Sequence, residues 1–490
     1  MSVALFKESI CFILVQDQSS SNYDFPDKKT LKSFLSNCVA DAKENSDFQI
    51  ASISIPLTYV APLAILQSME IKDRMHYYMD RPVDELSLIA YGSVISGSFQ
   101  GKGRFNSVKD FSIECLKRTA SYPEASEAFM GPHFFNTFTF SDKSNSKDIF
   151  PAATVFLPEW HLYSVKGQYG FVINLRVDED SNIDDLFIRL LERYDYFKSF
   201  DYSTHRNQIG TKKEEEILDT IITKSSFEKA VSGALEDLAK SLYHKIVLAQ
   251  KITFKNHTKS EGVQFLNRLR DRFPGCYTFS FSDGSGKTFI GSSPEKLLQI
   301  RKGVISTEAI AGSSSRGREP IQDAQLGMEL LGSEKNLREH DLVRESILKR
   351  LKAIGVKTSC DERPRLLTLT NVQHLMTKIK GVISSDIHIL EIASELHPTP
   401  AVGGQPRQFA VPRIRELEGF ERGLYAGLLG WFNSKNDGDL IVGIRSAQFN
   451  KDSVDVFAGA GIVNGSKIEE ETAEIELKRQ AIMKSIMLEI

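Results

Sequence analysis

The sequence predicts an α+β protein, an α/β sandwich in which large antiparallel sheets are flanked by helices. Short runs of alternating apolar and polar residues, rich in aromatic residues and bounded by turn residues, fill the first half of the chain. Such runs are typical of paired strands. From residue 226 onwards, helical spacing alternates with β-branched runs. This mixture of hairpins and helices favours antiparallel sheets over a doubly wound parallel sheet.

The composition restricts the classes of function. The chain has 490 residues and a formal net charge of -3, and its basic residues are spread along the sequence, so nucleic acid is not an expected partner. No run approaches the ~20 apolar residues of a membrane helix, so we expect no membrane insertion. The five cysteines lack CxxC spacing, which fits reduced thiols. We expect a soluble cytoplasmic protein that is a monomer or a weak homodimer.

The sheet-rich half of the chain comprises residues 1–225. Its apolar start, residues 1–16, predicts a first strand, and the polar stretches 17–30 and 203–215 predict surface loops. Paired strands are predicted in the runs LSLIAYGSVISGSFQG from Leu86, FFNTFTFSD from Phe134 and AATVFLPEWHLYSV from Ala152.

Residues 226–490 alternate between helices and strands. Apolar residues at helical spacing predict helices at 227–243, 266–273, 334–355 and 467–488. Alternating runs predict strands at 244–254 and 276–282.

The segment DGSGKT, residues 283–288, resembles the end of a phosphate-binding loop, whose backbone amides surround a nucleotide's phosphates. The first glycine of that motif would fall at position 281, which is Phe281. The segment also joins two strand-like runs instead of leading into a helix. A hairpin turn is therefore predicted.

Lys245 and Glu295 are charged residues in apolar surroundings. Lys245 opens a strand and shares one face with Val247 and Ala249. Burial lowers an ammonium pKa, so this lysine could be a general base; the alternative is a strand-end lysine that reaches solvent. Glu295 follows a Gly-Ser-Ser-Pro corner and could be a general acid with a raised pKa. Its alternative is a carboxylate in the first turn of a helix.

Three glutamates on predicted helices are candidate metal ligands. Glu339 lies on one helix, and Glu471 and Glu474 share a face of the C-terminal helix. Mg²⁺ prefers oxygen ligands and commonly takes one or two carboxylates from the protein. The alternative for Glu474 is a surface pair with Lys478, four residues later.

A glycine run, FAGAGIV at residues 457–463, is the candidate anion site. The backbone amides of Gly459 and Gly461 could bind a carboxylate, with positive charge from Arg445 and Lys478. The alternative is a tight structural turn.

Together these segments resemble the chorismate-utilising family, which contains isochorismate, salicylate, anthranilate and aminodeoxychorismate synthases. The resemblance runs from about residue 90 to the C-terminus and is densest from residue 245 to 480. The motifs ELHPTPAVGG from Glu395 and FERGLYAGLLGW from Phe420 are similar to isochorismate synthase versions. The water-using branches carry a lysine at the position of Lys245, where anthranilate synthases generally carry glutamine.

The resemblance implies an isomerase that converts chorismate to isochorismate. Lys245 would deprotonate the water that attacks C2, and protonated Glu295 would donate to the hydroxyl leaving C4. Mg²⁺ would be held by Glu339 and Glu474, and through water by Glu471. The pyruvyl carboxylate would be bound by Arg445, Tyr425, Lys478, Gly459 and Gly461, and His374 and Thr399 would line the pocket.

The resemblance also implies one large fold, with residues 1–225 as its N-terminal half and residues 226–490 as the chorismate-binding catalytic region. Menaquinone biosynthesis is the favoured pathway, and siderophore biosynthesis is the alternative. A salicylate synthase and an ammonia-dependent synthase component are rival activities. The sequence departs from the family pattern at Ser313–Ser315, at Gln250 and at Ile475.

Overall fold

The computed structural model describes residues 25–69, 73–124, 128–144, 150–203, 221–256, 262–369 and 372–486. The strand predicted in residues 1–16 lies outside these ranges, as does the loop predicted at 203–215 except for Ser203. The loop predicted at 17–30 is wrong at its end. Helix α1 already begins at Lys28, because Asp27 caps it by accepting a hydrogen bond from the Thr30 amide.

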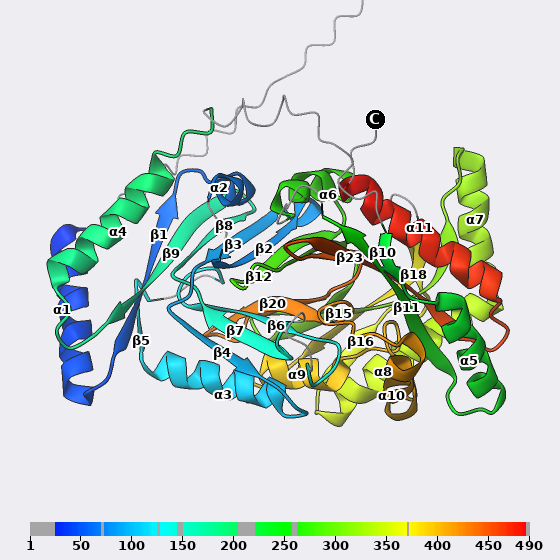
Figure 1. Cartoon of the computed structure of the whole chain (residues 1–490). Helices are drawn as coiled ribbons and strands as arrows, with labels where there is room; N and C mark the ends of the chain where they lie inside the picture. Colours follow the sequence, from blue (N-terminus) through cyan, green and yellow to red (C-terminus); the bar gives the residue numbers. More distant parts are fainter. Residues whose placement is uncertain are drawn as a thin grey trace, which may run out of the picture.

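Two large sheets form the centre of the molecule (Figure 1). In the described part of the chain, the larger sheet has 13 strands. Their order is β10 (Ile221–Lys224), β11 (Lys245–Lys255), β23 (Ser453–Val463), β22 (Ser446–Phe449), β13 (Thr288–Ser293), β12 (Tyr277–Asp283), β2 (Met75–Arg81), β3 (Leu86–Tyr91), β8 (Trp160–Val165), β9 (Gln168–Val177), β1 (Gln49–Leu57) and β5 (Thr119–Tyr122), with β19 (Gly404–Gln405) beside β11.

The smaller sheet has 10 strands among the described residues. Their order is β16 (Lys357–Cys360), β18 (Val372–Val382), β15 (Val304–Ser315), β14 (Lys296–Arg301), β21 (Gly438–Val442), β20 (Leu428–Asn433), β6 (His133–Phe138), β7 (Ala153–Leu157) and β4 (Ile95–Phe99), with β17 (Arg365–Thr368) beside β18.

Both sheets contain strands from both halves of the sequence. In the larger sheet β12 pairs with β2, and in the smaller sheet β20 pairs with β6. These pairings are antiparallel, and the described exception is β1 with β5, which are parallel. The predicted α+β class with large antiparallel sheets is therefore confirmed.

Helices cover the outer faces of the sheets (Figure 1). At one end α1 packs on α4 and β1, α3 packs on β4 and β7, and at the other end α5, α10 and α11 pack on β11 and β23. The described helices are α1 (Lys28–Asn45), α2 (Pro62–Ser68), α3 (Arg104–Lys117), α4 (Ile183–Lys198), α5 (Phe227–Ala239), α6 (Leu266–Arg272), α7 (Pro320–Gly332), α8 (Glu334–Ala353), α9 (Ile389–Leu396), α10 (Arg407–Glu418) and α11 (Ile468–Ile486).

An aromatic core lies between strands of the two sheets. Tyr77 and Phe279 of the larger sheet and Phe135, Phe156 and Trp431 of the smaller sheet belong to one buried cluster. Aromatic side chains of this size bury a large apolar area, so they hold the two sheets together.

The predicted hairpin at residues 283–288 is confirmed. Strands β12 and β13 pair antiparallel on either side of it, with Phe281 opposite Phe289. Gly284 and Gly286 have φ angles of 80° and 81°, a conformation that favours glycine.

The described cysteines, Cys38, Cys115, Cys276 and Cys360, are free thiols. Over the residues that the structure describes, no helix has the length and apolar character needed to cross a membrane.

Candidate active site

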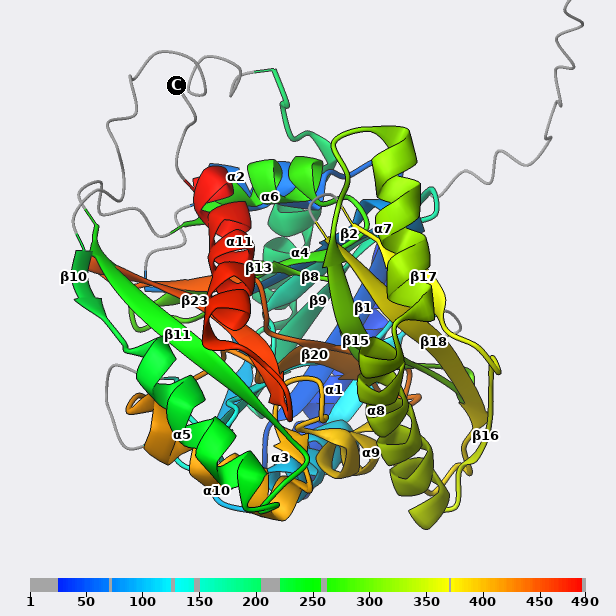
Figure 2. The ribbon, with the colours of Figure 1, turned by 90° about the vertical axis from the view of Figure 1, so that its right-hand side faces the viewer.

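A pocket of about 120 Å³ lies where β11 and β23 of one sheet approach β15 and β18 of the other. Figure 2 shows β11, β23 and α11 on one side of this region and β15, β18 and α8 on the other. Ten of the twelve residues predicted for the site line the pocket, and Glu471 and Thr399 do not. The ten are Lys245, Glu295, Glu339, His374, Tyr425, Arg445, Gly459, Gly461, Glu474 and Lys478.

Lys245 begins β11 and points into the pocket together with Val247. Its side chain is 2% exposed, and its ammonium donates a hydrogen bond to Oε1 of Glu339 at 2.6 Å. The alternative of a lysine that reaches solvent is therefore wrong. Its ammonium is therefore held inside the pocket by a carboxylate that lines the same pocket.

Glu295 lies between β13 and β14, so its alternative position in a helix is wrong. It is 7% exposed, and the Thr399 hydroxyl donates to its Oε1 at 3.4 Å. Burial raises the pKa of Glu295 to about 7, although Thr399 and the charge of Lys245 act in the opposite direction. A carboxyl with this pKa is partly protonated at neutral pH and can donate a proton.

The glycine run lies within strand β23, so the alternative of a tight turn is wrong. A Cβ at Gly461 would lie 3.0 Å from Cε of Lys245 and 3.1 Å from Oε1 of Glu339, and one at Gly459 would lie 2.8 Å from the Tyr425 hydroxyl. Both positions therefore need glycine because the side chains of Lys245, Glu339 and Tyr425 pass close to the strand.

The amides of Gly459 and Gly461 point away from β11. Their partners across the ladder are Ala249 and Val247. The Ala249 amide donates to Glu418 and the Val247 amide donates to Gly403, both on the side of β11 opposite β23. These are therefore non-hydrogen-bonded pairs of the antiparallel ladder, in which the amides of both residues face outward. The two glycine N–H groups can bind an anion.

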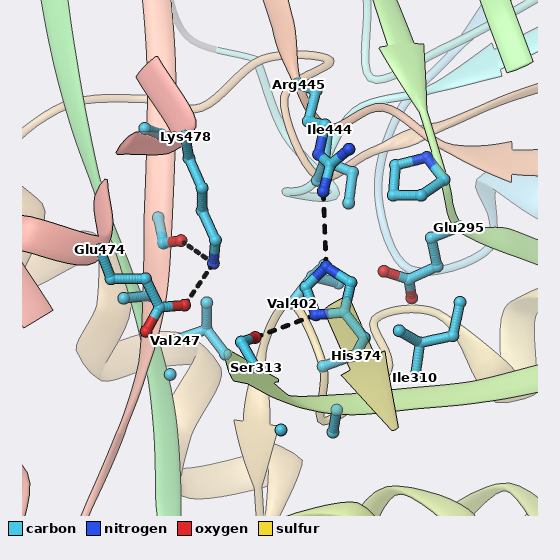
Figure 3. A pocket seen from close by; sticks show the side chains of 18 of the residues that line it. Val247, Glu295, Ile310, Ser313, His374, Val402, Ile444, Arg445, Glu474 and Lys478 are labelled. Carbon is cyan, nitrogen blue, oxygen red and sulfur yellow. Dashed lines mark hydrogen bonds and ion pairs between the residues drawn. The ribbon is translucent and has the colours of Figure 1, made fainter. Parts of the chain in front are cut away.

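Arg445 is the cation of the pocket without an acidic partner among the described residues. Its guanidinium donates to Nε2 of His374 at 3.4 Å, and Nδ1 of His374 contacts the Ser313 hydroxyl at 2.9 Å (Figure 3). Burial and the charges of Arg445 and Lys478 hold the pKa of His374 well below its ordinary value, so the imidazole is neutral. Burial also lowers the Arg445 pKa. An anion in the pocket would compensate this charge.

Backbone strain accompanies Arg445, whose φ angle is 51°. A non-glycine residue in this region costs free energy and is common at functional sites. Tyr425 lies nearby with its ring stacked on Phe457 at 5.0 Å.

The carboxylates predicted as metal ligands lie on α8 and α11. Lys478 donates to Glu474 at 2.7 Å and to the Gly459 carbonyl at 3.0 Å (Figure 3). The alternative pair of Glu474 with Lys478 is thus present, but inside the pocket. Burial opposes ionisation of Glu474, yet the charges of Lys478, Lys245 and Lys335 lower its pKa overall. Burial and the charges of Glu474 and Glu339 raise the pKa of Glu471, against a hydrogen bond from Ser466.

Ionised oxygen donors are the ligands that Mg²⁺ prefers, so Glu339 and Glu474 fit a magnesium ion in chemical type. Among the described side chains, no three acidic, histidine or cysteine groups converge as a preformed metal site. Both carboxylates are paired with lysines instead.

Four residues that contribute to the site have no role in the sequence-based prediction. Ser313 contacts His374, and Lys335 acts electrostatically on the α11 carboxylates. Lys335 is four residues before Glu339 on the same helix, and this spacing predicts from the sequence that the two side chains lie close together. Arg422 and Glu418 form a buried ion pair that binds backbone groups of β11 and of Val402.

A model of the family described as "Chorismate binding enzyme" matches residues 33–487. The chain belongs to this family. The resemblance seen in the sequence motifs is thereby confirmed. The match covers the pocket and both sheets, so the family assignment applies to the fold as a whole.

Several relatives of the family are known. Isochorismate synthase MenF of Bacillus subtilis (strain 168) is 28% identical over 471 residues, which cover 94% of this chain and 98% of that relative. The salicylate biosynthesis isochorismate synthase of Pseudomonas aeruginosa is 36% identical over 263 residues, and the match spans 55% of that relative.

Solved structures agree with the fold. MenF, the menaquinone-specific isochorismate synthase from Escherichia coli, has a TM-score of 0.72 at 24% identity and covers 92% of this chain and 99% of its own. Anthranilate synthase component I from Streptococcus pneumoniae TIGR4 has a TM-score of 0.63 at 20% identity. The match covers 81% of this chain and 92% of that chain. At these identities the likeness shows the fold alone.

Proposed function

We propose that this chain is an isochorismate synthase, an isomerase that converts chorismate to isochorismate. The observation that carries the proposal is that buried Lys245 and Glu295, whose pKa is about 7, line one pocket with an arginine that lacks an acidic partner among the described residues. Relatives named as isochorismate synthases support it, because the one from Bacillus subtilis matches over nearly its whole length.

The reaction adds water at C2 and removes the C4 hydroxyl. Lys245, as the free amine, takes a proton from a water molecule while the water oxygen bonds to C2. The ring double bonds shift and the C4–O bond breaks. Glu295 donates its proton to the departing hydroxyl, which leaves as water. Lys245 has then gained a proton and Glu295 has lost one, so exchange with solvent restores both groups.

The remaining side chains bind the substrate. Arg445 and the outward amides of Gly459 and Gly461 supply donors for the pyruvyl carboxylate. Lys478 and the Tyr425 hydroxyl lie beside them.

Two further polar groups have supporting roles, one lining the pocket and one behind Glu295. Neutral His374 accepts from Arg445 and so orients the guanidinium. Thr399 holds the Glu295 carboxyl through its hydroxyl.

We further propose magnesium as the cofactor. Glu339 and Glu474 would hold it, with Glu471 reached through water. Bound there, the ion would neutralise the carboxylate on the chorismate ring.

Menaquinone biosynthesis in the cytoplasm is the proposed setting, with a protein that is a monomer or a weak homodimer. The support is the length of the matches. The Bacillus subtilis MenF relative aligns over 98% of its length, whereas the salicylate-pathway relative aligns over 55%.

The test is to incubate the purified protein with chorismate and Mg²⁺ and to separate the products by chromatography. Lys245→Ala should lower kcat by ~10²- to 10⁴-fold, the range for loss of a general base. Lys255→Ala, at the exposed end of the same strand, is the matched control and should keep full activity. Salicylate with pyruvate as products would replace the proposal with a salicylate synthase. Turnover only with added ammonia would refute the water mechanism.

A further inference from the structure

A second cavity, of about 210 Å³, adjoins the catalytic pocket. We call it the side pocket. It shares four lining residues with the catalytic pocket, namely Ser313, Arg445, Glu474 and Lys478. A molecule in the side pocket therefore reaches the same charged groups as the substrate.

One wall of the side pocket is an apolar stripe on α11. Ala473, Leu477 and Ala481 are spaced four residues apart, so they share one face of the helix. Leu477 is 57% exposed, although the buried face of this helix includes Ile475 and Ile482. Phe273 and Val372 line the pocket too and add apolar surface. An apolar body would bury this surface.

The wall formed by β15 is short and polar. It consists of Ser313, Ser314 and Ser315, the segment that departs from the family pattern. Serine side chains are small and carry no charge, so they leave room beside α11 and do not repel an anion.

The charges lie at the end shared with the catalytic pocket. Glu474 is negative but is paired with Lys478 at 2.7 Å. Arg445 pairs with no carboxylate in the described part of the chain, and its partner His374 is neutral. The side pocket thus offers one uncompensated cation at its inner end and an apolar wall further out.

We infer that the side pocket binds aromatic carboxylates larger than a single ring. The carboxylate lies at Arg445, and the outer ring lies against Leu477 and Phe273. Because Arg445 would also hold the pyruvyl carboxylate of chorismate, the occupant competes with substrate. The competition rests on the proposed function, whereas the binding does not.

The binding test titrates the purified protein by calorimetry, without chorismate, with benzoate, 2-naphthoate and the neutral 2-naphthamide. We expect 2-naphthoate to bind about tenfold more tightly than benzoate, because its second ring buries several more carbon atoms. The amide should bind more weakly than 2-naphthoate because it carries no charge for Arg445.

Two variants locate the outer ring. Leu477→Ser should remove the preference for 2-naphthoate over benzoate, while Leu242→Ser, an exposed leucine next to α5, should keep it. Ala473→Phe places a ring in the pocket from an exposed helix position and should weaken 2-naphthoate binding but not benzoate binding.

The inference is overturned if 2-naphthoate binds no more tightly than benzoate, or if Leu477→Ser leaves the preference intact. Competition is then measured as inhibition of chorismate turnover, and 2-naphthoate should raise KM without changing kcat. If chorismate is not converted but Leu477-dependent binding persists, the proposed function fails and the side pocket stands.

Discussion

At the scale of single residues, burial gives Glu295 and Lys245 their chemical character. Burial raises the pKa of Glu295 to about 7, against the hydrogen bond from Thr399, which lowers it. Lys245 is equally buried, but it faces the Glu339 carboxylate. The same pocket thus contains a carboxyl that is partly protonated near neutral pH and a buried lysine that is paired with a carboxylate.

Glu295→Gln should abolish the acid step and lower kcat by ~10²- to 10⁴-fold. Glu345→Gln, which changes an exposed carboxylate on α8, is the matched control for activity.

In the unmodified protein kcat should fall as the pH rises above about 7, because Glu295 loses its proton. A pH profile of kcat that is flat from about pH 6 to about pH 9 would contradict this role, because this interval includes the range of roughly one unit on either side of the pKa in which the carboxyl titrates.

Glu295→Gln should also raise the free energy of unfolding at a pH above the pKa of Glu295. The pKa of Glu295 is about 7 in the folded protein and 4.5 ordinarily. The folded state therefore binds more protons between these values, and stability is lost as the pH rises through 7. Glu295→Gln should remove a penalty of about 3 kcal/mol at pH 8. Urea unfolding at pH 8 and pH 5 measures this, and an equal effect at both pH values would contradict it.

At the scale of elements, strand β23 passes close to the side chains of Lys245 and Glu339. Gly461→Ala would place a Cβ 3.0 Å from Lys245 and 3.1 Å from Glu339. We expect kcat to fall by at least about tenfold, as expected for a displacement near 1 Å of a reacting group. Gly332→Ala, where a Cβ meets nothing within 4 Å, is the control. Steady-state kinetics with circular dichroism separates misplacement from misfolding, and normal kcat in Gly461→Ala would refute the close approach.

The sequence was sufficient for local features of the elements. Apolar periodicity predicted α8, α11 and β11, and turn chemistry predicted the hairpin between β12 and β13. These features depend on neighbouring residues, so they can be read locally.

Other features depend on residues that are distant in the chain. The outward amides of Gly459 and Gly461 follow from the pairing of β23 with β11, more than two hundred residues earlier. The pKa of Glu295 depends on burial and on Thr399, which arrives from a separate segment. From the sequence pattern alone, Glu295 could lie either at a corner after a strand or in the first turn of a helix.

The family motifs predict some of these long-range features at the site. The motifs group Lys245, Glu295 and Arg445 into one site, and the structure places all three in one pocket. The motifs do not predict the contact between Ser313 and His374. These residues lie opposite each other on β15 and β18, so their contact depends on how the two strands pair.

At the scale of the whole molecule, the two sheets bury several histidines in neutral form. His76 of β2 and His133 of β6 are fully buried, and burial lowers the pKa of each to about 4 from 6.5. The unfolded chain therefore binds more protons below pH 6.5, and stability is lost as the pH falls from 6.5 towards 4.

Each of these histidines should contribute up to about 3 kcal/mol to this loss. His76→Asn, which removes one titrating group, should flatten the fall in unfolding free energy between pH 6.5 and 4. Denaturant titrations at several pH values provide the measurement. A slope identical to that of the unmodified protein would contradict the account of buried neutral histidine.

The arrangement of both halves in shared sheets places the pocket between strands β11 and β23 of one sheet and β15 and β18 of the other. The charged groups that line the pocket thus come from segments held by both sheets. In the proposed reaction, this pocket adds a water oxygen to C2 of chorismate while the C4 hydroxyl departs.

The most direct test is to run the reaction in water enriched in oxygen-18 and to analyse the isochorismate by mass spectrometry with fragment assignment. The account predicts one heavy oxygen, located in the hydroxyl at C2. Isochorismate without label, or with label at a position other than the C2 hydroxyl, would contradict it.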